Sequence, residues 1–275
     1  MIYKTVNLKD EFPCLKQDVS LTAFCPENSK EISPNRKRKT ILIIPGGAYV
    51  FLSERETDPI ALRLVGFDVN AFVLNYNLGP YESPYPFLEG LAAIAYIRNH
   101  AEEYHVDPDH LGVMGFSAGG NFAATLGFLQ NQKDWADLLN VPLAKIRING
   151  ILLGYPVIDL DDAGLTGEML LKNQPDQKKD FEILPHVDSS YPPTFLFALN
   201  DDQVVDSMHS LKMAMALKKA GVRFEFHYYP IGYHGVSLAD HSVYADEGEE
   251  PAYKPYLAYV ENWFSHALRF IREIL

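Results

Sequence analysis

Short apolar runs alternate with longer segments of helical spacing along most of this chain, and this alternation constrains the fold more than any other feature. Residues 40–44 read TILII, an uninterrupted aliphatic run of the kind found in strands that are buried on both faces. Apolar residues at helical spacing follow at 58–65, and a second strand-like run follows at 69–76. Strands that alternate with helices are joined by crossover connections, so the pattern predicts an α/β fold with a mostly parallel central sheet flanked by helices.

The alternation continues through the rest of the chain. We predict strands at 19–24 (antiparallel and at an edge), 40–44, 69–76, 111–116, 148–153, 194–199 and 224–229. We predict helices at 58–65, 86–104, 118–130, 207–220 and 256–274. The length of 275 residues and the apolar content of 47% suit one large domain, so 1–275 is interpreted as a single domain. The long insertion 157–190 is interpreted as a pocket wall or lid, because idle loops of that length are uncommon.

The charge balance disfavours a nucleic-acid-binding protein, and the two cysteines disfavour a disulfide-rich one. Acidic residues number 36 against 24 basic ones, for a net charge of −12, whereas nucleic-acid-binding proteins need a basic face. The four basic residues at 36–39 would suit an anion patch, although such a run is more often a solvated turn. The longest uncharged run, 111–132, is interrupted by glycines and is better explained by a buried strand, turn and helix than by a membrane span. Cys14 and Cys25 do not make a disulfide framework.

The N-terminus reads MIYKTVNLKDEF and lacks the pattern of a secretory signal. With only two cysteines, this predicts a cytoplasmic protein. We expect a small-molecule ester as partner, with no nucleic acid and no membrane, and the sequence is compatible with a homo-oligomer.

Ligands on sheets of this kind bind at the carboxyl ends of the strands, so the residues that follow each strand are the candidates for chemistry. The strand at 111–116 is followed by the sequence GFSAGG at 115–120, a G-x-S-x-G pattern between a strand and a helix. The chain reverses sharply there, and the turn lifts the Ser117 hydroxyl clear of the sheet. It also places the Ala118 N–H at a helix N-terminus, where negative charge is favoured. The strand and helix on either side favour a nucleophile turn over an ordinary glycine-rich turn.

The strand at 40–44 ends in PGGAY at 45–49. A reaction through a tetrahedral intermediate needs at least two donors aimed at the oxyanion, and a glycine-rich loop lets backbone N–H groups approach closely. A simple strand-to-helix turn is the alternative interpretation, but the nearby serine turn favours an oxyanion loop.

The general base and its acid are predicted from the order of the elements. His234 lies in GYHG, just past the last predicted strand, where a histidine can reach across to the serine. His241 is the one serious rival among nine histidines. The acid should follow the strand at 194–199, where Asp206 is better interpreted as a helix N-cap. Asp201 and Asp202 are neighbours that point to opposite sides, so at most one of them faces the histidine.

From about residue 39 onward the chain resembles the acetyl-esterase and hormone-sensitive-lipase-like branch of the bacterial α/β-hydrolases. The resemblance rests on PGGAY (45–49), GFSAGG (115–120), NDDQVVD (200–206) and GYHGVSL (232–238), and the order Ser, Asp, His agrees with it. It implies a serine carboxylesterase that hydrolyses short-chain, acetyl-type esters through an acyl-enzyme intermediate, without cofactor or metal. The site residues that it implies are Ser117, Asp202 and His234 as the triad, and Gly47, Ala48 and Ala118 as oxyanion donors.

Asp202 is chosen over Asp201 because its D-x-x-V spacing to Val205 resembles the acid loop of the family. Two positions depart from the family pattern. Pro45 stands where many members have His, and Ala48 stands where they have a third Gly, although a backbone donor survives that change. The larger members carry an N-terminal cap domain, and we expect none here because the strands begin too early in the chain.

Aromatic residues near the motifs are candidates for lining the pocket, and we expect two or three of six to do so: Tyr49, Phe51, Tyr76, Tyr81, Phe116 and Tyr233. Those taken as substrate-binding are Tyr49, Phe116 and Tyr233. A carbohydrate deacetylase or a formamidase-like amide hydrolase would use the same triad, so these alternatives stay open. A non-catalytic binding protein would require the loss of a triad residue, and none is missing from the sequence.

Overall fold

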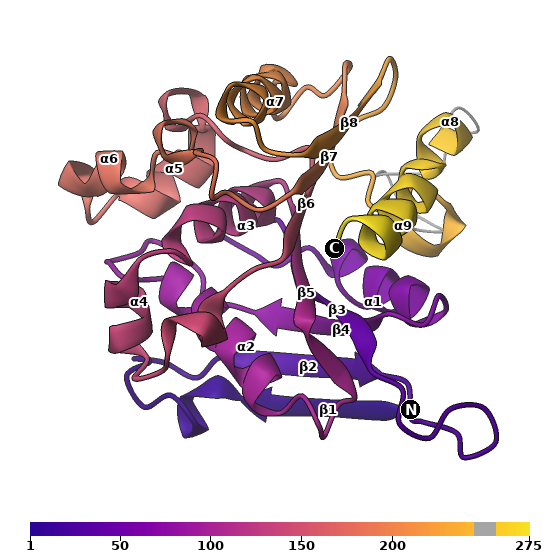
Figure 1. Ribbon diagram of the computed structural model, residues 1–275. Coiled ribbons are helices and arrows are strands. Elements are labelled where there is room, and N and C mark those ends of the chain that lie inside the picture. The colour runs from indigo at the N-terminus through magenta and orange to yellow at the C-terminus, as the bar shows by residue number, and fades with distance from the viewer. Residues whose placement is uncertain (245–256) are drawn as a thin grey trace.

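One eight-stranded sheet runs through the part of the chain that the computed structural model describes, residues 1–244 and 257–275 (Figure 1). Its strand order is β1-β2-β4-β3-β5-β6-β7-β8. The strands β1 (Ile2–Asn7) and β2 (Ser20–Cys25) pair in antiparallel fashion. The others form a parallel set: β3 (Arg38–Ile44), β4 (Asn70–Asn75), β5 (Val106–Phe116), β6 (Gly150–Gly154), β7 (Thr194–Leu199) and β8 (Phe224–Tyr229). This is the mostly parallel α/β architecture predicted from the sequence.

Helices cover both faces of the sheet, with α2 and α3 on one side and α1 and α9 on the other (Figure 1). The α-helices are α1 (Asp58–Val65), α2 (Phe87–Asn99), α3 (Ala118–Leu129), α4 (Lys133–Leu138), α5 (Gly164–Leu171), α6 (Lys178–Phe181), α7 (Met208–Ala220), α8 (Ala258–Glu261) and α9 (Trp263–Glu273). Short 3₁₀ helices are η1 (Leu8–Asp10), η2 (Glu54–Glu56), η3 (Leu143–Ile146), η4 (Leu160–Asp162), η5 (Pro175–Gln177), η6 (Leu184–His186) and η7 (His241–Val243). Within the described ranges, no helix combines the length and the apolar composition that crossing a bilayer would require.

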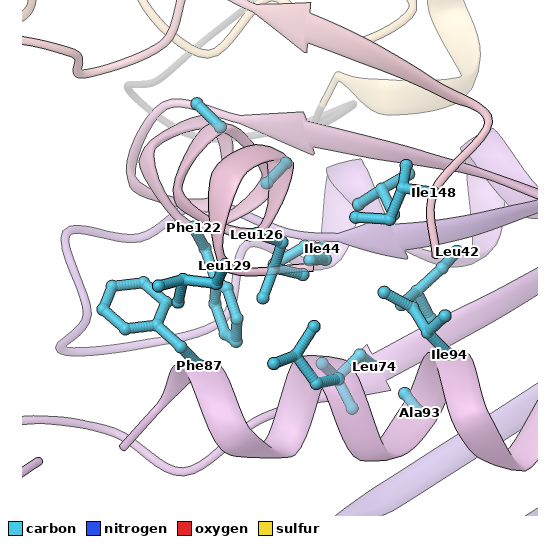
Figure 2. Packing of buried hydrophobic residues seen from close by; sticks show 14 of the residues in the cluster. Leu42, Ile44, Leu74, Phe87, Ala93, Ile94, Phe122, Leu126, Leu129 and Ile148 are labelled. Atoms are coloured by element: carbon cyan, nitrogen blue, oxygen red, sulfur yellow. The ribbon is translucent and has the colours of Figure 1, made fainter. Parts of the chain in front are cut away.

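The aliphatic run of β3 supplies side chains to two separate cores, because successive residues of a strand point to opposite faces. Leu42 and Ile44 belong to the cluster that α2 and α3 cover, whereas Ile41 and Ile43 belong to the cluster on the other face, with α1 and α9. All four have no exposed surface. Figure 2 shows the first cluster, in which strand residues such as Leu42 face residues of α2 and α3. A strand covered on both faces needs no polar side, and this explains the uninterrupted TILII sequence.

Several predicted elements agree with the structure, and the differences have local causes. The bounds of α1, β7 and β8 are those predicted. The predicted edge strand is β2, but it is not at the edge, because β1 pairs outside it. The residues of β1 are mostly exposed or half-buried, so the sequence there shows no apolar pattern. The helix predicted at 86–104 ends at Asn99, and the closing helix is divided at Asn262. The predicted first residue of that closing helix, Tyr256, lies outside the described residues.

The basic run at 36–39 is used in structural contacts rather than as a patch for anions. Arg36 and Arg38 both pair with the carboxylate of Asp68, each at 2.6 Å. The Lys39 ammonium donates hydrogen bonds to three backbone carbonyls at the C-terminal end of α9. The run therefore ties the start of β3 to the turn after α1 and to the last helix, and it is not a solvated turn.

Replacing Leu42 by alanine should lower the free energy of unfolding by about 2–5 kcal/mol, because the lost methyl groups leave a cavity in a closed core. The matched change Leu62→Ala, on α1 at a position that is 52% exposed, should shift it by less than about 1 kcal/mol. Urea unfolding of both variants beside the unsubstituted protein measures the difference. Similar losses for the two variants would contradict this assignment of the core.

Candidate active site

Ser117 occupies a strained turn between β5 and α3. Its backbone angles, φ 52° and ψ −119°, lie in a region that residues with side chains rarely adopt. Three backbone hydrogen bonds hold it there. Its N–H donates to the carbonyl of Gly154 at 3.0 Å, and its carbonyl accepts from Asn121 and Val157 at 3.1 Å each. The strain is therefore stabilised by the neighbouring strand β6 and by the first turn of α3.

The two glycines of the G-x-S-x-G sequence are required by close contacts of the main chain. A Cβ atom on Gly115 would lie 2.1 Å from the carbonyl oxygen of Gly119, and one on Gly119 would lie 2.2 Å from the carbonyl oxygen of Ile44. Neither distance is possible for a real side chain. The glycine requirement expected from the sequence thus follows from the packing of β5, α3 and β3.

Three side chains from three separate loops form one chain of hydrogen bonds. The Nε2 atom of His234, in the loop after β8, lies 2.8 Å from Ser117 Oγ. Its Nδ1 atom lies 2.7 Å from Asp202 Oδ2, in the loop after β7. A carboxylate only accepts, so Nδ1 carries the proton, and Nε2 is left to accept from the serine hydroxyl. The structure therefore brings together the serine, histidine and aspartate that were predicted as a triad.

The Asp202 carboxylate is held rigidly on its other side. Its Oδ1 atom accepts the backbone N–H groups of Val204 and Val205 at 2.9 and 3.0 Å, and its side chain is 1% exposed. Asp201 is exposed and accepts a hydrogen bond from the side chain of the preceding asparagine. Asp206 accepts the N–H of Met208, the first residue of α7, at 2.8 Å. It therefore bonds the start of the helix, as expected, but Ser207 rather than Asp206 occupies the N-cap position.

Two of the three predicted oxyanion donors line the same hollow as the serine, and the third directly follows Ser117. Gly47 and Ala48 have φ angles of 121° and 51°, and both line the hollow that contains Ser117 and His234. Ala118 is the first residue of α3. Among the described residues, no protein acceptor receives a hydrogen bond from the N–H groups of these three. These donors are therefore available to an oxygen atom of a ligand, and the N-terminus of α3 adds a favourable dipole.

The hollow around Ser117 has apolar side chains at its rim. Phe51, Leu165 and Val204 all line it and are 57%, 47% and 74% exposed. Residues 162–166, at the start of α5, contribute part of the wall. The role of the whole insertion 157–190 as a wall or lid stays a prediction.

The aromatic residues predicted to bind substrate do not line this hollow. Tyr49 and Phe116 have no exposed surface. The Tyr49 hydroxyl donates to Asn121 Oδ1 at 2.9 Å, and the Phe116 ring packs in the core behind the sheet. Tyr233 packs against another tyrosine at the side of the histidine loop. Of the six aromatic residues considered, Phe51 alone lines the hollow, instead of the two or three expected.

The prediction for Phe116 failed because successive side chains of a strand point to opposite faces. Phe116 is the last residue of β5 and belongs to the core cluster of α1 and α9, on the face away from α2 and α3. Tyr49 follows the turn after β3 and lies under the loop, against Tyr76 and Tyr81. A motif identifies the position of the reacting groups, but it does not say which face an adjacent side chain takes.

Sequence reasoning missed two buried residues behind the site, Glu56 and Tyr155. The Glu56 side chain accepts the Gly46 N–H and the Tyr155 hydroxyl, each at 2.7 Å. Burial raises the pKa of the Glu56 carboxyl, against the lowering effect of these two hydrogen bonds and of the charge of His234. Glu56 lies in the charged sequence ERETD, which is typical of a solvated turn, so no sequence signal marked it.

Sequence reasoning also missed His209, which fixes the start of the insertion. Its buried Nδ1 atom accepts the backbone N–H groups of Ile158 and Asp159, both at 2.9 Å. Its Nε2 atom lies 3.1 Å from the carbonyl oxygen of Asp162 and donates to it. Burial lowers the pKa of His209, although the nearby Asp162 and Asp159 act to raise it. The imidazole is therefore held in its neutral form next to the hollow.

Three side chains of β8 and α9 have ligand atoms close enough for a metal ion: Glu225, His227 and His266. Arg269 already supplies a cation to this group, since its guanidinium and His227 Nε2 both donate to Glu225 Oε1 at 2.7 Å. The two imidazole rings are stacked 4.2 Å apart rather than converging on one point. The group is accounted for as an ion-pair cluster, and none of it lines the hollow.

Comparisons with known proteins agree with this arrangement. Residues 26–217 match the BD-FAE family. The chain is 29% identical over 222 residues to the endo-1,4-beta-xylanase B of Butyrivibrio fibrisolvens, covering 76% of this chain and 34% of that protein. It is 24% identical over 264 residues to the acetylxylan esterase of Xylanibacter ruminicola, covering 88% of this chain and 48% of that protein. The chain thus spans less than half the length of these two curated relatives.

Solved structures match over nearly the whole chain. The acetyl ester-xyloside bifunctional hydrolase from Caldicellulosiruptor lactoaceticus is 31% identical, with a TM-score of 0.76 and 96% of each chain covered. The carboxylesterase Cest-2923 from Lactobacillus plantarum is 26% identical, with a TM-score of 0.85, covering 99% of this chain and 98% of that one. An α/β hydrolase from a deep-sea metagenome library is 29% identical, with a TM-score of 0.77. The fold is that of the α/β hydrolases.

The neutral His209 should stabilise the folded protein near neutral pH and lose that effect in acid. Because its folded-state pKa lies below the ordinary value of 6.5, its contribution is complete above about pH 6.5 and is lost as the pH falls through the folded-state value. Denaturant unfolding of the unsubstituted protein and of His209→Gln, at about pH 7.5 and about pH 5.5, isolates this contribution. The gap in stability between the two proteins should be smaller at the lower pH, and a constant gap would contradict the assignment.

Proposed function

This chain belongs to the BD-FAE family, and on that premise we propose that it is a serine carboxylesterase that hydrolyses short-chain, acetyl-type esters. The single observation that carries the proposal is the unbroken hydrogen-bonded chain from Ser117 through His234 to Asp202. A hydroxyl 2.8 Å from an unprotonated imidazole nitrogen is arranged for activation as a nucleophile. The other nitrogen of the same imidazole is hydrogen-bonded to the buried Asp202 carboxylate, which orients the ring for acyl transfer.

The first half of the proposed reaction forms an acyl-enzyme. Ser117 Oγ attacks the acyl carbon while its proton moves to His234 Nε2, and Asp202 stabilises the imidazolium and holds its orientation. The carbonyl oxygen becomes an oxyanion, which accepts hydrogen bonds from the N–H groups of Gly47, Ala48 and Ala118. Collapse of the tetrahedral intermediate breaks the ester bond, and the alcohol leaves with the proton from Nε2.

The second half repeats these steps with water in place of serine. His234 Nε2 takes a proton from the water as its oxygen attacks the acyl carbon, and the same N–H groups stabilise the second oxyanion. The carboxylic acid is released, and Ser117 regains its proton from Nε2. No group other than these side chains and the backbone donors is needed.

Acetylated carbohydrate is the second candidate substrate class. Its support is the printed names of two relatives, an acetylxylan esterase and an acetyl ester-xyloside bifunctional hydrolase. The apolar rim formed by Phe51, Leu165 and Val204 instead favours a small acyl or aryl group at the entrance. We therefore propose simple acetyl esters as the first candidate substrate class and sugar acetates as the second.

A cytoplasmic location is part of the proposal. Cys14 and Cys25 are both free thiols, one exposed and one buried. An exposed free thiol is typical of a reducing compartment.

An ester panel tests the function. The protein should hydrolyse aryl acetate and butyrate with higher kcat/KM than aryl decanoate, because the apolar side chains at the rim, such as Phe51 and Val204, are themselves largely exposed and would bury little of a long acyl chain. Ser117→Ala should lower kcat by on the order of 10⁴-fold or more, because the nucleophile is lost. Its thermal unfolding curve should stay close to that of the unsubstituted protein.

Including acetylated xylo-oligosaccharide and an N-formyl substrate in the panel separates the alternatives. Higher kcat/KM on the oligosaccharide would move the assignment to a carbohydrate deacetylase. Turnover restricted to the formyl amide would move it to an amidase. Substantial ester hydrolysis by correctly folded Ser117→Ala would exclude the whole mechanism.

Substitution of adjacent aspartates tests the acid. Asp202→Asn should lower kcat by about 10⁴-fold, because an amide in that place favours the wrong imidazole tautomer. Asp201→Asn makes the same chemical change one residue away, at an exposed position, and should leave kcat within about twofold. Steady-state kinetics on aryl acetate provide the comparison, and a severe loss at residue 201 alone would reverse the choice.

A further inference from the structure

Glu56 is a buried carboxylate that lies directly behind the nucleophile. Glu56 is only 2% exposed, although it belongs to the charged 3₁₀ helix η2. A Cβ atom on Gly46 would lie 2.9 Å from Glu56 Oε2 and 2.9 Å from Ser117 Cβ. The carboxylate oxygen and Ser117 Cβ therefore both border the space that a side chain at residue 46 would fill. Burying a charged group is costly unless it is hydrogen-bonded, so its partners indicate what it does.

One oxygen of Glu56 holds the loop that carries the candidate oxyanion donors. Glu56 Oε2 accepts the Gly46 N–H at 2.7 Å. Gly46 directly precedes Gly47 and Ala48, which have positive φ angles and line the hollow. Fixing the N–H of Gly46 fixes the peptide plane that enters this strained segment. The orientation of the next two N–H groups then depends on this anchor.

The other oxygen holds the histidine loop through Tyr155. The Tyr155 hydroxyl donates to Glu56 Oε1 at 2.7 Å and accepts the backbone N–H of Ser237 at 3.0 Å. Its ring lies edge-on to the His234 imidazole, with centroids 5.2 Å apart. One carboxylate is thus connected to the loops on both sides of the serine.

The hydrogen bonds also indicate the charge of Glu56. Ser237 N–H occupies one lone pair of the Tyr155 oxygen, and the phenolic proton is directed at Glu56. The second carboxylate oxygen faces another donor, Gly46 N–H. Both oxygens accept, and these hydrogen bonds favour the ionised form against the burial that raises the pKa of the carboxyl. A negative charge near His234 favours the imidazolium that the proposed reaction forms.

We propose that Glu56 is a positioning residue for this site, which sets the oxyanion loop through Gly46 and the histidine loop through Tyr155. The inference rests on the proposed serine-esterase function. Glu56 touches no reacting atom, and its effect is exerted on the geometry of the donors and the base. A displacement of about 1 Å in such groups costs on the order of 10²-fold in rate.

The test compares variants by two measurements, steady-state kinetics on aryl acetate and the rate of labelling by a fluorophosphonate. Labelling requires an activated serine and an oxyanion site, but not a particular ester. Glu56→Ala should lower kcat and the labelling rate by about 10²-fold, with KM changed by less than about threefold. Glu56→Gln can accept from Gly46 through its amide oxygen but lacks the charge, so it should lose about tenfold and partly restore activity relative to Glu56→Ala.

Glu89 supplies a matched control. It is 1% exposed, its carboxylate also accepts two hydrogen bonds, both from Asn77 at 2.9 Å, and it does not line the hollow. Glu89→Gln and Glu56→Gln should both lower the unfolding temperature, but Glu89→Gln should keep the labelling rate and kcat of the unsubstituted protein. If Glu56→Ala does not fold, Glu56→Gln decides the question.

The outcomes separate the two proposals. Equal labelling rates for the unsubstituted protein and Glu56→Gln would overturn the positioning role while leaving the esterase assignment intact. Equal losses in Glu56→Gln and Glu89→Gln would also overturn it, because a general loss of stability would then be the cause. An unsubstituted protein that is neither labelled nor active would overturn the proposed function and this inference with it.

Discussion

The close approach of main chain to main chain around Ser117 is the constraint on which the rest of the site depends. A side chain on Gly119 would meet the carbonyl oxygens of Ile44 and Pro45 at 2.2 and 2.5 Å, so the first turn of α3 lies directly against the end of β3. The same contact brings the loop after β3 next to the serine, because Gly46 lies against Ser117 Cβ. The nucleophile and the neighbouring backbone donors are therefore placed by backbone packing, which is stiffer than side chains that reach across a cavity.

The environment of His234 is set by two buried carboxylates that act in different ways. Asp202 contacts the ring directly, through Nδ1, and is held by two backbone N–H groups. Glu56 reaches the ring only through the edge of Tyr155, and its own partners belong to the loops on either side. Little water reaches either group, since both are almost fully buried. Negative charge in such surroundings interacts more strongly with a developing imidazolium than the same charge at the surface.

Much of this arrangement was determined by local sequence patterns. The parallel sheet follows from aliphatic runs such as that of β3, because a strand covered on both faces leaves no room for polar residues. The nucleophile turn follows from glycines on both sides of Ser117, because only glycine tolerates these backbone contacts. His234 was found from its place after the last strand, since parallel strands end at one edge of the sheet. Each of these inferences depends on neighbours within a few residues or on the order of the elements.

The remaining features were decided only by the tertiary structure, because they depend on contacts between segments that are far apart in the chain. Glu56 and Tyr155 are separated by 99 residues, and each has an ordinary sequence context. The choice of Asp202 over Asp201 came from a resemblance in spacing, and only the structure shows the contact that turns Asp202 toward His234. Tyr49 is likewise buried by contacts with distant residues, Tyr76 and Tyr81. Whether a side chain faces the pocket or the core depends on the packing of the whole sheet against its helices, which local patterns do not specify.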